Sequence, residues 1–168
     1  MGARRGPTVV VGLGNALMGD DAVGLALLDH LREHFDIPGD VLLLDGSTMG
    51  RSLMPLLEEA QRLVFLEAID IHEVAGTPVL LEGEAVDQHF ADKRPAHFAD
   101  LRDLLAQRAS GLRLAAERVA VGIQPGPVAL GLELSACARS GLEGAAELVV
   151  GRLAAWGHLC QPLSSLHA

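Results

Sequence analysis

Aromatic side chains are scarce in this chain of 168 residues, which contains no Tyr, one Trp and four Phe. Basic residues are outnumbered as well, because 13 Lys and Arg against 22 Asp and Glu leave a formal net charge of −9 at pH 7. Single-stranded nucleic acid is bound by stacking on aromatic rings, and any nucleic acid is attracted by positive charge. The composition therefore argues against a nucleic-acid partner.

Cysteine and long apolar runs are also rare. The two cysteines, Cys137 and Cys160, form no C-x-x-C pair, which is typical of a protein from a reducing compartment. No apolar run reaches the ~20 residues that a membrane span needs. The apolar run behind Arg4 and Arg5 is too short for an export signal. We therefore expect a soluble, cytoplasmic protein without a membrane partner.

Hydrophobic residues make up 49% of the chain, and strand and helix patterns alternate along it without an internal repeat. This pattern predicts one domain over residues 1–168, an α/β fold of the three-layer α/β/α sandwich type. Its twisted sheet should have about five mostly parallel strands. The predicted strands are 8–11, 41–44, 63–66, 78–81 and 119–123, and the predicted helices are 22–35, 52–60, 99–109 and 142–156. Because the connection before strand 78–81 is too short for a helical crossover, we expect that strand to lie antiparallel beside strand 63–66.

A glycine-rich turn follows the first predicted strand and carries two adjacent carboxylates, Asp20 and Asp21. The turn leads directly into the first predicted helix, so both acids lie beyond the carboxyl end of a strand. In open α/β sheets this is the edge at which ligands bind. The turn is therefore the first candidate for a functional site.

Three interpretations of this turn were compared. A dinucleotide site is disfavoured, since Leu17 stands where the third glycine of G-x-G-x-x-G belongs, and two aspartates would repel a pyrophosphate. No nucleotide cofactor is therefore expected. Asp20 and Asp21 could instead cap the following helix and interact with its dipole. They could also bind a divalent cation through their carboxylate oxygens. These last two interpretations stay open together, because one acid can cap while its neighbour binds metal.

Further acids follow two other predicted strands: Asp45 after the second, and Glu67 with Asp70 after the third. Three loops would then bring carboxylates to one edge of the sheet. Their charges repel one another, and a bound cation would reduce this repulsion. Imidazole ligands could come from the long segment before helix 99–109, which contains His89 and His97. A segment of that length is often functional, although a single histidine in a loop is more often merely solvated.

Five segments in the same order resemble the motifs of a known family, the NiFe-hydrogenase maturation endopeptidases. Residues 14–24 read G-N-A-L-M-G-D-D-A-V-G, similar to the family's G-N-x-L-x-x-D-(D/E)-x-x-G. Residues 45–48 read D-G-S-T and resemble its D-G-G-T turn, while residues 67–70 read E-A-I-D and resemble D-A-x-D. Residues 122–125 and 133–135 read G-I-Q-P and E-L-S, similar to its G-x-Q-P and E-L-S elements.

The resemblance implies a cytoplasmic peptidase that removes a short C-terminal peptide from the large-subunit precursor of a NiFe-hydrogenase. Nickel already carried by that precursor would serve as the recognition element. The family's metal-contacting positions correspond to Asp21, Glu67 and His97, with Glu67 standing in place of an aspartate. Two oxygens and one imidazole suit nickel.

The resemblance also suggests which side chains act on the peptide. Asp21 and Asp45 are the candidate catalytic groups, and Asp45, Thr48 and Asp70 are the candidate substrate-binding residues. Thr48 and the neighbouring serine also suit an ordinary Asx turn after Asp45. Since no G-x-S-x-G nucleophile motif is present, an alternative stays open: a non-enzymatic checkpoint protein that docks on a nickel-loaded partner without cutting it.

Overall fold

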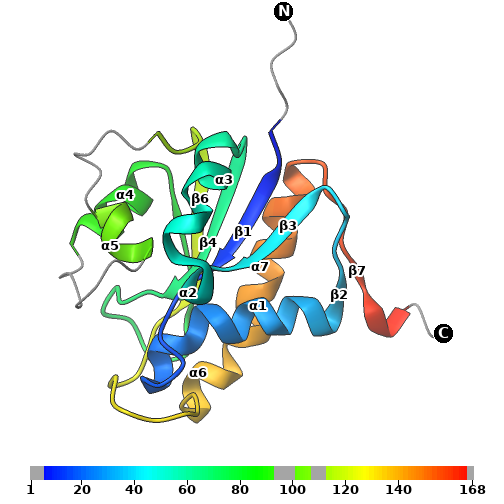
Figure 1. Ribbon diagram of the computed structural model, residues 1–168. Coiled ribbons are helices and arrows are strands. Elements are labelled where there is room, and N and C mark those ends of the chain that lie inside the picture. The colour runs from blue at the N-terminus through cyan, green and yellow to red at the C-terminus, as the bar shows by residue number, and fades with distance from the viewer. Residues whose placement is uncertain (1–5, 93–100, 107–112, 166–168) are drawn as a thin grey trace, which may run out of the picture.

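The computed structural model describes residues 6–92, 101–106 and 113–165, which form a twisted sheet with helices on both faces (Figure 1). The five strands of the sheet lie in the order β3-β1-β4-β6-β5. All neighbouring pairs are parallel except β5 and β6, which are antiparallel. The strands are β1 (Thr8–Gly12), β3 (Val41–Asp45), β4 (Arg62–Ala68), β5 (Pro78–Glu82) and β6 (Glu117–Ile123). The predicted three-layer, mostly parallel α/β fold is confirmed.

The position of β5 differs from the prediction. β5 is antiparallel, as expected, but it pairs with β6 instead of β4. The reason is that β1 and β6 already flank β4 on its two sides. The connection after β4 therefore passes the end of β6, where Gln124 N donates to Thr77 O at 2.8 Å.

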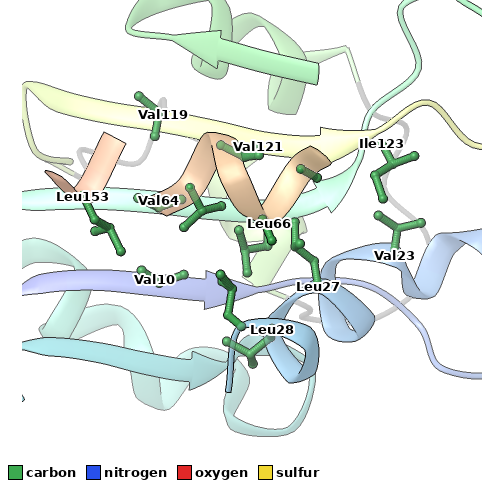
Figure 2. Close-up of a cluster of buried hydrophobic side chains, with 14 of the residues drawn as sticks. Val10, Val23, Leu27, Leu28, Val64, Leu66, Val119, Val121, Ile123 and Leu153 are labelled. Carbon is green, nitrogen blue, oxygen red and sulfur yellow. The ribbon is translucent and has the colours of Figure 1, made fainter. Parts of the chain in front are cut away.

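Helices α1 (Val23–His34) and α7 (Leu142–Ala155) cover one face of the sheet. Their apolar side chains meet those of the central strands, as Figure 2 shows for Leu27 and Leu28 of α1 beside Val10 and Leu66. These four side chains are at most 1% exposed. Both faces of β1 are buried, which explains why its sequence is a continuous apolar run instead of an alternating one.

The opposite face is covered by shorter helices (Figure 1). Predicted helix 52–60 is divided into a 3-10 turn and α3, and predicted helix 99–109 is seen as α5 within the described residues. The helices on this side are α2 (Gly46–Met49), η2 (Gly50–Leu53), α3 (Met54–Glu59), α4 (Glu84–Ala91) and α5 (Leu101–Ala106). Helix α4 was not predicted, and it holds Val86 and Phe90 in the core.

The remaining elements are short. They are η1 (Gly19–Ala22), β2 (Phe35–Asp36), α6 (Ala136–Ser140), β7 (Gln161–Pro162) and η4 (Leu163–Ser165). β2 and β7 form a separate antiparallel pair. Within the described part of the chain, no helix combines the length and apolar character needed to cross a membrane.

Two glycines allow α1 to begin close to the sheet. Gly14 has φ +138°, and a Cβ there would lie 2.2 Å from Asp21 O. A Cβ at Gly24 would lie 2.1 Å from Leu66 O and 2.2 Å from Leu13 O. The backbone of α1 therefore touches the backbone of β4 and of Leu13, the residue after β1, and this contact fixes the position of Asp21 relative to the end of β4.

Candidate functional site

The site lies where the order of the sheet reverses. β1 has β3 on one side and β4 on the other, and the helices that connect these strands cover opposite faces. This arrangement leaves a crevice beyond the carboxyl ends of β1 and β4, the usual ligand site of such sheets. Asp21 lies in η1, which follows β1, and Glu67 is the second-last residue of β4.

One guanidinium joins these two carboxylates. Nη1 of Arg102 donates to Oδ1 of Asp21 at 2.9 Å, and Nη2 donates to Oδ2 at 3.2 Å. The same Nη1 lies 3.5 Å from Oε1 of Glu67. The Arg102 side chain, from the first turns of α5, is 16% exposed, that of Asp21 is 20% exposed and that of Glu67 is fully buried. The two acids that the resemblance assigns to nickel therefore share a cationic partner.

Glu67 has a second partner in His89 of α4. The Nε2 atom of His89 lies 2.8 Å from Oε2 of Glu67, and the His89 side chain is 11% exposed. A buried carboxylate is costly unless donors satisfy it. Arg102 and His89 approach different oxygens of Glu67, the first as an ion pair at 3.5 Å and the second at hydrogen-bond distance.

Asp20 and Asp21 have different roles, and neither caps a helix through its side chain. Asp20 is 3% exposed and accepts hydrogen bonds from Gly126 N at 2.8 Å, Ser135 N at 2.7 Å and Ser135 Oγ at 2.7 Å. Burial by itself would raise the pKa of Asp20, but the hydrogen bonds from Ser135 and Gly126 hold it below its usual value. Asp21 accepts from Asn15 N at 2.9 Å in addition to Arg102. The side-chain cap is therefore wrong for both acids, although both lie in the first turn of η1, as the helix-dipole interpretation expects.

Asp45 forms a local cap. Its Oδ1 accepts from Ser47 N at 2.9 Å, Ser47 Oγ at 2.6 Å and Thr48 N at 3.3 Å, so it is the N-cap of α2. The Thr48 hydroxyl donates to Asp45 O at 3.4 Å. The ordinary turn chemistry expected for this segment is present, and the candidate catalytic and substrate-binding roles of Asp45 and Thr48 stay predictions.

Asp70 belongs to a network around a buried glutamine. Gln124, 5% exposed, donates through Nε2 to Oδ1 of Asp70 at 2.9 Å and accepts through Oε1 from Ile71 N at 2.8 Å. The side-chain hydrogen bond from Gln124, followed by the backbone hydrogen bond from His72, lowers the pKa of Asp70. Gln124 therefore connects the end of β6 to the loop that follows β4.

A cavity of about 510 Å³ opens beside these groups. It is lined by Asp21, Asp70 and His89 and by apolar side chains that include Leu81 and Val128. A lining that combines carboxylates and an imidazole with aliphatic groups suits an extended peptide, whose backbone is polar and whose side chains include apolar ones.

Sequence analysis placed His97 in the metal site, and that residue lies outside the described residues. In the described part of the chain, no three His, Cys, Asp or Glu side chains are arranged to hold a metal ion. Sequence analysis also missed the roles of Arg102 and His89. The i, i+4 pair of apolar residues in α4 would have shown that His89 lies on a helix, whereas nothing in the sequence connects Arg102 to Asp21.

Comparison with known proteins identifies the family of the chain. A family model described as "Hydrogenase maturation protease" matches residues 25–152. The chain is 30% identical over 156 residues to the hydrogenase expression/formation protein HupM of Azotobacter chroococcum, covering 92% of this chain and 75% of that protein. It is 34% identical over 99 residues to HupD of Rhodobacter capsulatus, covering 58% of this chain and 47% of that relative's length.

Among solved structures, the hydrogenase maturating endopeptidase HybD of Escherichia coli superposes with a TM-score of 0.82 at 28% identity. That match covers 95% of this chain and 99% of the other. The family model spans well over half of the chain. The chain belongs to the hydrogenase maturation protease family, a family of peptidases.

Proposed function

We propose that this chain is a cytoplasmic endopeptidase that removes a short C-terminal peptide from the nickel-loaded large-subunit precursor of a NiFe-hydrogenase. The nickel belongs to the substrate in this proposal, and Asp21, Glu67 and His97 are the residues that would contact it. The observation that carries the proposal is the pairing of Asp21 and Glu67 with one cation at the switch point of the sheet. Family membership supplies the class of reaction.

The donor chemistry fits a nickel ion. Two carboxylates on the ends of neighbouring strands supply oxygen ligands, and histidine supplies a nitrogen ligand. Asp21 is partly exposed and lines the cavity, while Glu67 is buried beside it. A metal ion held by the precursor could therefore be approached by Asp21 from the cavity, with the precursor's own ligands filling the other coordination positions.

The proposed peptide site is the cavity lined by Asp21, Asp70 and Val128. Of the two candidate catalytic acids, Asp21 faces this cavity, while Oδ1 of Asp45 is engaged by Ser47 and Thr48. These contacts support Asp21 as the acid that acts near the substrate and Asp45 as the residue that holds the neighbouring turn in place.

The test is a cleavage assay on purified large-subunit precursor, with and without nickel. Wild-type protein should shorten the nickel-loaded precursor and leave the nickel-free precursor intact. Asp21→Asn should lower the rate at least ~100-fold, because a ligand charge is lost. Asp21 and Arg102 are only 20% and 16% exposed, so loss of their ion pair should also lower stability. Cleavage is therefore compared at a temperature at which thermal unfolding shows the variant to be folded.

Two controls make this assay decisive. Asp29→Asn changes an exposed acid whose ion-pair partner among the described residues is the exposed Arg32 of the same helix, α1, and it should process the precursor at the wild-type rate. If the precursor binds the protein but is never shortened, the non-enzymatic checkpoint alternative replaces the proposal. Equal cleavage of nickel-free precursor would contradict nickel recognition.

A further inference from the structure

Arg102 occupies the position at which a metal ion bound by Asp21 and Glu67 would be expected. Its two terminal nitrogens meet both oxygens of Asp21 at 2.9 and 3.2 Å, and Nη1 lies 3.5 Å from Glu67. This is the fork geometry in which a guanidinium holds a carboxylate most firmly. Both oxygens of Asp21 are therefore in use while Arg102 stays in place.

The guanidinium also supplies the charge that this part of the protein requires. Glu67 is fully buried, and Asp21 lies beside the same crevice with a 20% exposed side chain. Arg102 remains protonated at every accessible pH, so it neutralises these acids without any bound metal. A divalent cation on the same oxygens would face a positive charge a few ångströms away in a poorly solvated site.

We propose that Arg102 is a resident cation that holds Asp21 and Glu67 in the free protein and is exchanged for nickel when the precursor docks. This inference rests on the proposed function, because it concerns the same site. Arg102 would thus set specificity: free divalent ions cannot displace the guanidinium, whereas nickel delivered on a protein surface has the additional binding energy of that interface.

Movement of the Arg102 side chain is the step that the exchange requires within the described residues. Leu101 and Leu105 of α5 are 0% and 1% exposed, so they anchor the helix in the core. Arg102 itself is 16% exposed and has a long, flexible stem. Its guanidinium can swing into the adjacent cavity by rotation about side-chain bonds while α5 stays in place.

The structure offers a matched control for an ordinary ion pair. Arg118 of β6 contacts Asp87 of α4 with the same two-nitrogen, two-oxygen arrangement, and its side chain is 13% exposed. Asp87 is not among the residues lining the cavity. Arg118→Gln therefore tests how the Ni²⁺ affinity of the protein responds to loss of an arginine–aspartate pair that lies away from the cavity.

The experiment is isothermal titration calorimetry of the tag-free, full-length protein with NiCl2. Arg102→Gln should bind Ni²⁺ at least ten-fold more tightly than the wild type, and Arg118→Gln should bind as the wild type does. The double variant Arg102→Gln/Asp21→Asn should lose the increase in Ni²⁺ affinity. That loss would assign the increase to the site at Asp21 and would exclude histidines elsewhere in the chain as its cause. An unchanged affinity in Arg102→Gln, or an equal gain in Arg118→Gln, would overturn the inference.

Arg102→Lys covers the case in which Arg102→Gln does not fold. It keeps a positive charge but loses the fork, so we expect at least a three-fold gain in Ni²⁺ affinity, and no gain would count against the inference. A cleavage assay separates this inference from the proposed function. Free Ni²⁺ should inhibit Arg102→Gln at concentrations that leave the wild type active. If wild-type protein cuts no precursor, the proposed function fails while the titration still decides the role of Arg102.

Discussion

The Nε2 atom of His89 lies 2.8 Å from Oε2 of Glu67, so an imidazole from α4 is the partner of a fully buried carboxylate at the end of β4. The contact connects a helix on one face of the sheet to the central strand beneath it. Glu67 can keep its charge in the interior only while such donors are present. His89 therefore positions Glu67, whether or not it ever touches the substrate.

Removing that donor should destabilise the protein. His89→Leu is expected to lower the free energy of unfolding by about 1–3 kcal/mol, the cost of leaving a buried acceptor without its donor. His89→Gln keeps an N–H group and should lose less. Chemical denaturation measures both values, and His34→Leu, at an exposed position in the last turn of α1, serves as the control. Equal losses in the Leu and Gln variants would show that the hydrogen bond is not responsible.

Asp20→Asn should also destabilise the protein. Both oxygens of Asp20 accept hydrogen bonds, and the amide nitrogen that replaces one of them in Asn would face an N–H or O–H donor of Gly126 or Ser135. We expect a loss of about 1–3 kcal/mol at neutral pH. The pKa of Asp20 is lowered in the folded state, so its contribution is present above the unfolded pKa of about 3.9 and is lost as the pH falls through the folded value.

The pH dependence of this variant follows directly. The difference in unfolding free energy between the wild type and Asp20→Asn should be largest near neutral pH and should shrink on acidification below about pH 4. Denaturation curves recorded over that range measure it. A difference that stays constant down to the acid limit would show that the charge of Asp20 does not stabilise the fold.

The contact between α1 and β4 can be tested with two glycines. Gly24→Ala places a Cβ 2.1 Å from Leu66 O, so it should destabilise the protein by about 1–3 kcal/mol through overpacking. Gly151→Ala, on α7 with no atom within 4 Å of the added Cβ, should instead stabilise by about 0.5–1 kcal/mol. Thermal unfolding compares the two, and a neutral Gly24→Ala would contradict the close approach described above.

Metal removal should have little effect on the isolated protein. If nickel arrives only with the precursor, tag-free protein should contain less than one nickel per chain, and treatment with a chelator should leave its unfolding temperature unchanged. A bound metal would raise that temperature by mass action. Elemental analysis and calorimetry before and after chelation test this, and firmly bound, stoichiometric nickel would identify a resident metal centre instead.

The fold was predictable because both faces of the central strands are buried. Runs such as Thr8–Gly12 and Val41–Asp45 are almost continuously apolar, and this pattern marks a sheet covered on both sides. Helix α4 was missed because its apolar content is modest and it lies between a glycine and a long charged segment. The pairing of β5 was wrong because the order of neighbouring strands depends on how many partners each strand already has.

The site was predictable only as far as the backbone determines it. Asp21 follows β1 and Glu67 lies at the end of β4, and parallel strands bring their ends together, so their proximity could be expected. Arg102 could not be found in this way, because its side chain reaches the crevice from a helix 81 residues beyond Asp21. Asp20 and Asp21 look equivalent in the sequence, but the chain buries one and leaves the other beside the cavity.

The hydrogen bonds of Asp20 also bear on the order in which the molecule is assembled. Gly126 and Ser135 lie 106 and 115 positions after Asp20 in the chain, and Gly131 further bonds to the neighbouring Leu17–Gly19 segment. During synthesis, the Asp20 carboxylate gains these donors only after residues 126–135 have been added, whereas the contacts of Asp21 come from residues no later than Arg102. A nascent chain or a fragment that ends before Gly126 therefore leaves Asp20 without the hydrogen bonds that it accepts in the complete fold.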